Sequence, residues 1–248
     1  MFEEICYKKN YIVDAICRLD FASPIPELKN SMPKEIYAVV KKYFPIADPQ
    51  DVIGTELSIS PINGPVVNQI STKQWVFLSR DRKNKCTIES ANVGFSITNY
   101  DRFDELRGAI IDILTVIMTH NPDNQGKRLG LRYINSFPLK DHGDWITEKF
   151  FTAISAHKDE KTIKLLTTLE YDVLEKDLNV RLSYGYNNPD YPAVIKREDF
   201  IIDIDAYTTG IIYCDDIPNY IDNMHNEVQS CFELMITDSL RADMNTGE

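Results

Sequence analysis

Two short stretches, Phe95-Ser96-Ile97-Thr98-Asn99-Tyr100 and Ile202-Asp203-Ile204-Asp205-Ala206-Tyr207, share a pattern of apolar, polar, apolar, polar, any residue and tyrosine. They lie 107 residues apart, and each comes before a long helical pattern. Alternation with a period of two is typical of a strand with one buried face. Because self-similarity at a fixed spacing indicates an internal repeat, we expect the chain to contain one structural unit twice.

The first half of the chain predicts a strand, a short helix, three strands and a long helix. Helical spacing of apolar residues and proline and serine start signals favour the helices, and alternation favours the strands. Asp101 is the expected N-cap of the long helix. The predicted elements span residues 11–21, 31–44, 52–60, 74–79, 87–98 and 103–120.

The second half repeats this order. Between the halves, residues 121–126 form a polar stretch that contains Pro122 and Gly126, which is typical of a boundary. We therefore expect repeats over residues 1–122 and 123–248, either as two domains or fused in one. The predicted elements of the second half span residues 128–137, 145–154, 162–173, 179–186, 200–205 and 217–235.

These elements predict an α+β fold made of two β-α-β-β-β-α pseudo-repeats. Strands that follow one another through short turns pair antiparallel, and the exposed apolar face of such a sheet needs a cover. The two long helices can supply that cover. We expect one curved sheet, or two abutting sheets, of about eight mainly antiparallel strands with both long helices on the concave face, a helix-grip-like arrangement.

Charge and composition limit the function classes. The 248-residue chain has a formal net charge of −11, so its field repels phosphate backbones and a nucleic-acid partner is unlikely. The basic stretch from Lys73 to Lys85 is interpreted as a hairpin turn. No apolar run is long enough to span a bilayer, and the acidic start is unlike a secretory signal. We therefore expect a cytoplasmic protein that does not associate with a membrane. The five scattered cysteines are expected to be reduced thiols.

Four stretches together resemble a sporadically distributed family of uncharacterised bacterial proteins. Gly-Leu-Arg-Tyr-Ile-Asn at residues 130–135 is the most specific, and Asp14 departs from the glutamate that the family usually shows. The resemblance implies a cytoplasmic prokaryotic protein, and the patchy distribution implies mobile or defence-associated genes. It supplies no reaction. The stretches are residues 7–21, 129–135, 202–207 and 225–237.

Asp203 and Asp205 lie two apart on a predicted strand, so their carboxylates share one face. Such a pair can hold a divalent cation if a third oxygen ligand approaches. The alternative is a solvated face or an ion pair with Arg132, which we favour because no other metal-site signature accompanies the pair. We therefore predict no metal site and no cofactor.

Arg132 and Asn135 are polar residues inside an otherwise apolar strand. Buried polar groups need partners. A structural bridge from this strand to Asp14 or Asp205 would satisfy them, and so would the carboxylate or phosphate of a ligand.

His225 and Glu227 lie two residues apart on the last long helix and face different directions, so they make a poor acid-base pair. We expect a surface or capping role for His225, although a nearby carboxylate would make it titrate near neutral pH. The candidate ligand-binding residues are Arg132, Asn135, Asp203, Asp205 and His225, and no catalytic residue is predicted.

Because no catalytic set is recognisable, the sequence favours a non-enzymatic binding or accessory protein over an enzyme. It would recognise a protein partner or a small ligand, with a role in bacterial, anti-phage defence, and a homodimer is compatible with this view. The first alternative is a hydrolase or nucleotide-acting enzyme in which Asp203, Asp205, Arg132 and His225 converge on one pocket. The second is a saddle-like nucleic-acid-binding protein, which the acidity disfavours.

Overall fold

The computed structural model describes residues 5–60, 64–138, 143–159, 161–162, 164–188, 192 and 199–246. Nine strands and five α-helices lie within these ranges. The strands are β1 (Ile12–Phe21), β2 (Ile46–Ser60), β3 (Gly64–Leu78), β4 (Asn84–Ile88), β5 (Asn92–Ile97), β6 (Gly126–Pro138), β7 (Leu165–Val173), β8 (Leu178–Asn187) and β9 (Asp199–Ile212). The helices are α1 (Lys34–Tyr43), α2 (Phe103–His120), α3 (Glu148–Ser155), α4 (Ile217–Met235) and α5 (Asp238–Thr246).

The nine strands form one sheet in the order β2-β3-β4-β5-β1-β6-β9-β8-β7. Every neighbouring pair is antiparallel, so the predicted α+β class with a large antiparallel sheet is confirmed. β1 and β6, the first strands of the two halves, pair with each other in the middle. The two halves thus contribute to one continuous sheet.

The middle of the first half differs from the prediction, because it holds four strands and not three. The single strand expected over residues 87–98 is divided into β4 and β5. At the turn between them, the Glu89 N–H donates to the Asn92 carbonyl at 2.9 Å. No glycine or proline marks the intervening Ser90-Ala91, so the sequence carries no strong turn signal there.

The two long helices begin and end where the apolar spacing predicts. Asp101, however, is not the N-cap of α2: Arg102 occupies that position, and no side chain caps the helix. The short α5 was not predicted, since its mostly polar sequence has only Leu240 and Met244 buried.

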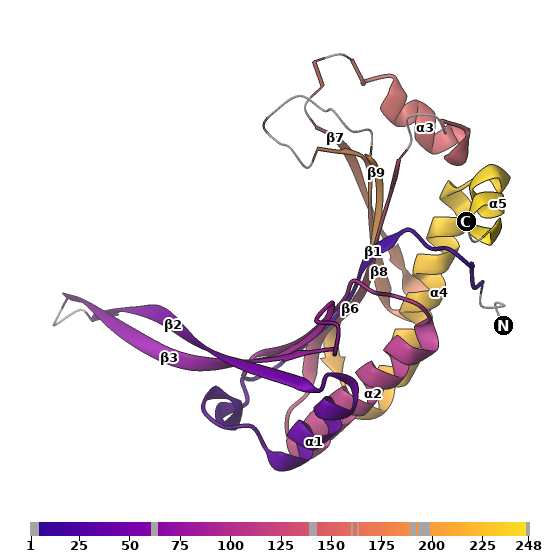
Figure 1. Ribbon diagram of the computed structural model, residues 1–248. Coiled ribbons are helices and arrows are strands. Elements are labelled where there is room, and N and C mark those ends of the chain that lie inside the picture. Colours follow the sequence, from indigo (N-terminus) through magenta and orange to yellow (C-terminus); the bar gives the residue numbers. More distant parts are fainter. Residues whose placement is uncertain are drawn as a thin grey trace.

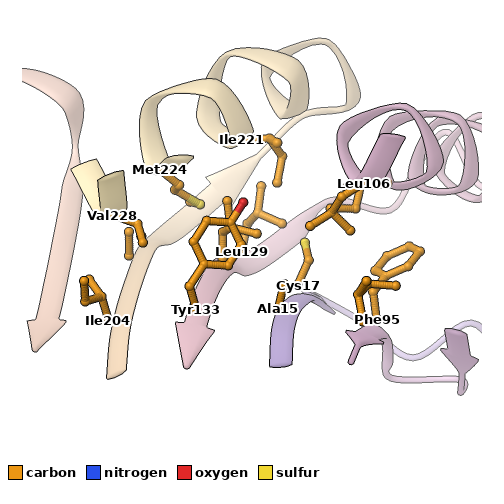
Figure 2. Packing of buried hydrophobic residues seen from close by; sticks show 14 of the residues in the cluster. Ala15, Cys17, Phe95, Leu106, Leu129, Tyr133, Ile204, Ile221, Met224 and Val228 are labelled. Atoms are coloured by element: carbon orange, nitrogen blue, oxygen red, sulfur yellow. The ribbon is translucent and has the colours of Figure 1, made fainter. Parts of the chain in front are cut away.

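Helices α2 and α4 lie on the same side of the sheet (Figure 1). Their buried residues recur at three and four, which places one apolar stripe of each helix against the strands. Figure 2 shows this layer, with Ala15, Tyr133 and Ile204 on the strands next to the helix that carries Met224. No helix of the described residues packs on the opposite side, which we call the open face.

Strands β2 and β3 form a long two-stranded ribbon that projects from the rest of the molecule (Figure 1). They pair with each other from Ile46 and Leu78 to Ser60 and Gly64. Among the described strands, the base of the ribbon alone joins the rest of the sheet, because β3 pairs with β4 over its last four residues, Trp75–Leu78.

The two tyrosines of the matched sequence pattern have different surroundings. Tyr100 follows the end of β5, and its ring lies 5.4 Å from that of Tyr133 on the helix side. Tyr207 lies within β9, where the Arg128 guanidinium stands 4.8 Å from its ring centroid. The similarity of the two stretches therefore covers the strand pattern and does not extend to the role of the tyrosine.

Among the residues that the structure describes, no helix is both long enough and apolar enough to cross a membrane.

Candidate functional site

The candidate residues from the sequence divide between the two faces of the sheet. Along β6, Tyr133 and Asn135 are buried toward the helices, whereas Arg132 is half-buried on the open face. Successive residues of a strand point to opposite faces, so this split follows from the spacing alone. Ile202 and Ile204 of β9 are fully buried toward the helices. Asp203 and Asp205 alternate with them along the strand and therefore lie on the open face.

On the open face, Arg132 pairs with Asp203 through two hydrogen bonds. Its Nε donates to Oδ1 at 2.6 Å and its Nη2 to Oδ2 at 2.5 Å. The predicted ion pair between these strands is confirmed, and the hydrogen bond to Asp203 raises the pKa of Arg132. The bridge to Asp14 or Asp205, one of the two alternatives for Arg132, is not the one observed, since Asp14 accepts its hydrogen bonds from Ser96 and Asp205 from Arg128 at 3.2 Å.

Further pairs extend this pattern across the open face. Nη2 of Arg18 lies 2.8 Å from Oδ1 of Asp20. The Glu170 carboxylate accepts hydrogen bonds from both Arg181 and Tyr207. Burial raises the pKa of Asp205 in spite of the nearby arginines. No cluster of three His, Cys, Asp or Glu side chains able to hold a metal ion occurs within the described ranges. The charged side chains described on this face therefore form ion pairs mainly with one another.

On the helix side, His225 of α4 lies in an aromatic setting. Its ring stacks on Phe103 with 3.6 Å between centroids and 4° between planes, and its Nδ1 lies 3.1 Å from the Tyr133 hydroxyl. The surface or capping role expected for His225 is wrong, because the residue is only 8% exposed. The reason is that His225 belongs to the apolar stripe of α4, next to Met224 and Val228.

The other ring nitrogen of His225, Nε2, is buried and has no hydrogen-bond partner among the residues that the structure describes. Burial lowers the pKa of this imidazole to about 4, although the charges of Asp222 and Asp104 act in the opposite direction. Desolvation disfavours the charged form of a histidine. The ring is therefore neutral at physiological pH and holds one proton.

A pocket of about 90 Å³ opens beside His225. It lies between the chain before β1, strand β6, the start of α2 and the second half of α4. Asn135 also lines it, so two of the five candidate residues come together there, while Arg132, Asp203 and Asp205 do not. Five aromatic side chains contribute to its walls, namely Tyr7, Tyr100, Phe103, Tyr133 and Phe232.

Polar contacts fix the position of residues 5–7, which form the N-terminal wall of the pocket. The Tyr7 hydroxyl donates to Oε1 of Glu233 on α4 at 2.7 Å, and Arg241 of α5 donates to Oε2 of the same carboxylate at 2.8 Å. Burial and the Glu233 carboxylate raise the pKa of Tyr7. Glu233 thus joins three segments that are distant in the sequence, and its oxygens are already engaged.

Sequence reasoning missed the aromatic residues of the pocket. Phe103 and Phe232 match the apolar spacing of their helices and so read as ordinary core residues. Tyr133 stands inside the Gly-Leu-Arg-Tyr-Ile-Asn stretch, which singled it out without assigning it a role. The one signal that could have pointed to the pocket is the pairing of Asn135 and His225 as polar residues on otherwise apolar faces.

No known protein-family model matches the chain, and no similar sequence was found among curated proteins.

Proposed function

We propose that the chain is a non-enzymatic binding protein and that the pocket beside His225 receives its ligand. The observation that carries this proposal is the buried Nε2 of His225, a residue that lines the pocket, which has no hydrogen-bond partner in the part of the chain that the structure describes. A buried donor or acceptor left without a partner costs about 1–3 kcal/mol. A ligand that hydrogen-bonds to this nitrogen would recover that free energy on binding.

The size of the pocket favours a small occupant. Pockets that enclose a drug-sized ligand usually measure roughly 300–1,000 Å³, and one water needs only about 10–15 Å³. At about 90 Å³, this pocket suits a fragment-sized molecule or a single side chain of a protein partner. Both occupants agree with a protein that recognises a partner or a small ligand.

The positions of the candidate residues weaken the enzyme alternative. That alternative needs Asp203, Asp205 and Arg132 to converge with His225, yet the first three lie on the open face and His225 lies on the helix side. Arg132 is also engaged by Asp203. The nucleic-acid alternative gains nothing from the open face, where each arginine described above has a carboxylate partner.

The wider role rests on the sequence. The accessory role in bacterial, anti-phage defence is supported only by the family resemblance. The duplicated, helix-grip-like unit is supported by the order of elements, since both halves run from a strand through a short helix and a set of antiparallel strands to a long helix. A homodimer stays a proposal without a further observation.

A fragment screen by protein NMR tests the binding proposal. We expect neutral aromatic fragments to shift the signals of His225 and Tyr133, and His225→Phe to weaken the best fragment by about tenfold, the effect of one hydrogen bond. Asp203→Asn is the matched control and should bind as the wild type does. A metal-dependent turnover that Asp203→Asn abolishes would contradict the proposal and favour the enzyme alternative.

A further inference from the structure

The hydrogen bond between Tyr133 and His225 bears on whether Nε2 of His225 is a donor or an acceptor. The 3.1 Å contact joins the phenolic oxygen to Nδ1 of a neutral imidazole. A phenol O–H is a stronger acid than a neutral imidazole N–H, and an imidazole nitrogen accepts better than a phenolic oxygen. These acidities favour the tyrosine as the donor to Nδ1, which leaves the single ring proton on Nε2.

Nε2–H is consequently a buried donor that lacks an acceptor among the described residues. The stacked Phe103 ring covers one face of the imidazole, and the edge of Tyr133 meets it at 78°. Neither aromatic ring supplies an oxygen acceptor to Nε2. A molecule in the pocket that presents an acceptor beside the ring would satisfy Nε2–H.

We propose that the pocket selects an uncharged ligand group that presents an acceptor oxygen, such as an amide or ketone carbonyl, on an apolar body. This inference rests on the proposed binding function and names the chemistry of its ligand. The oxygen accepts the hydrogen bond from Nε2–H. The aromatic walls receive the apolar body, because burial of apolar surface from both sides is favourable.

Charge at the pocket disfavours an anionic ligand. Among the described residues that line it, the charged side chains are Asp101, Arg102 and Glu233, so carboxylates outnumber guanidinium groups there. Arg102 is 70% exposed and lies 3.9 Å from Asp101, which leaves it mostly in water. The net charge of −11 adds a long-range repulsion of anions.

A cationic ligand is disfavoured for a different reason. An ammonium group has only donors, so it would meet the Nε2–H donor without making a hydrogen bond. Glu233, a half-buried carboxylate of the pocket lining, already accepts hydrogen bonds from Tyr7 and Arg241. A buried cation without a carboxylate of its own is costly.

Four fragments with the same ring separate these possibilities on the wild-type protein: benzamide, toluene, benzoate and benzylamine. Dissociation constants would be measured by titration of protein NMR signals, since fragments of this size bind at roughly millimolar concentrations. We expect benzamide to bind about tenfold more tightly than toluene, which lacks the acceptor. Benzoate and benzylamine should bind more weakly than benzamide.

The outcomes distinguish this inference from the proposed function. Equal binding of toluene and benzamide, or tightest binding of benzoate or benzylamine at this pocket, would overturn the acceptor-oxygen inference and leave the binding function standing. If none of the four fragments shifts the pocket signals at saturating concentration, the proposed function fails as well. Imidazole nitrogen shifts that place the proton of His225 on Nδ1 would also overturn the inference.

Discussion

At the scale of single residues, the chain places a neutral histidine where water is largely excluded. Burial lowers the pKa of His225 to about 4, and this outweighs the opposing charges of Asp222 and Asp104. The only protein group that hydrogen-bonds to its ring among the described residues is Tyr133. A residue held in this state costs stability, which is consistent with a role in binding.

The lowered pKa predicts how stability depends on pH. In the unfolded chain the histidine takes up a proton near pH 6.5, whereas in the folded protein it does so only near pH 4. Between these values the unfolded state binds more protons, so the free energy of unfolding decreases as the pH falls. The loss is on the order of 3 kcal/mol.

Chemical denaturation at a series of pH values between 4 and 7 checks this prediction. His225→Phe should lack most of the acid-dependent loss, and His157→Gln, a change at an exposed histidine, should retain it. If the free energy of unfolding of the wild type, His225→Phe and His157→Gln depended on pH in the same way, the lowered pKa of His225 would be contradicted.

The pairing of Arg132 with an aspartate of β9 could be predicted from the residues, because a period of two puts polar side chains of neighbouring strands on one face. The sequence could not predict that Arg132 pairs with Asp203 and not with Asp205. In the sheet Arg132 lies opposite Asp205, and its side chain reaches along the strand to Asp203. Such a diagonal contact depends on register and twist, which the sequence does not reveal.

At the scale of elements, α2 and α4 form the layer that creates the pocket. Phe103 at the start of α2 stacks on His225 of α4, and Arg107 forms two hydrogen bonds, of 2.5 and 2.8 Å, with Asp222. Both contacts join the helices to each other. The position of the pocket therefore depends on how α2 and α4 pack.

The packing of α4 predicts unequal effects of two substitutions on the same helix. Ile221 is fully buried, so Ile221→Ala should lower the free energy of unfolding by about 2–5 kcal/mol through lost burial and a cavity. Leu234→Ala is the matched control, because Leu234 is 72% exposed and should change stability by less than about 0.5 kcal/mol. Urea denaturation measures both, and similar losses would mean that α4 packs through a different stripe.

The long helices were predictable as elements because their apolar stripes extend over four or more turns. The β4–β5 turn was not, since neither glycine nor proline occupies Ser90-Ala91. Glu89 and Asn92 close that turn with a backbone hydrogen bond, aided by the Asn92 amide, which donates to the Glu89 carboxylate at 3.2 Å. Turns built in this way leave a weak trace in the sequence.

At the scale of the whole molecule, the sheet is continuous but unevenly supported. Its central strands, β1, β6 and β9, lie under the long helices, whereas the ribbon of β2 and β3 extends away from them (Figure 1). The pairing of β1 with β6 joins segments more than a hundred residues apart, and the element order alone did not reveal it. Sequence reasoning therefore predicted the class of fold and left the strand order open.

The ribbon predicts a contrast in hydrogen exchange. An isolated two-stranded hairpin is marginally stable in water, and within the described ranges the ribbon pairs with a third strand over Trp75–Leu78 at its base alone. Backbone amides of residues 50–60 and 64–74 should exchange orders of magnitude faster than those of β1, β6 and β9. Native-state exchange followed by mass spectrometry measures this contrast, and equal protection would indicate that another surface covers the ribbon.

The central claim is that the space beside His225 is a ligand site. A crystal structure of the wild-type protein soaked with benzamide tests it most directly. We predict the fragment between Phe103, Tyr133 and α4, with its carbonyl oxygen within about 3.2 Å of Nε2 of His225. Benzamide bound only elsewhere, or a pocket that stays without the fragment at saturating concentration, would contradict the claim.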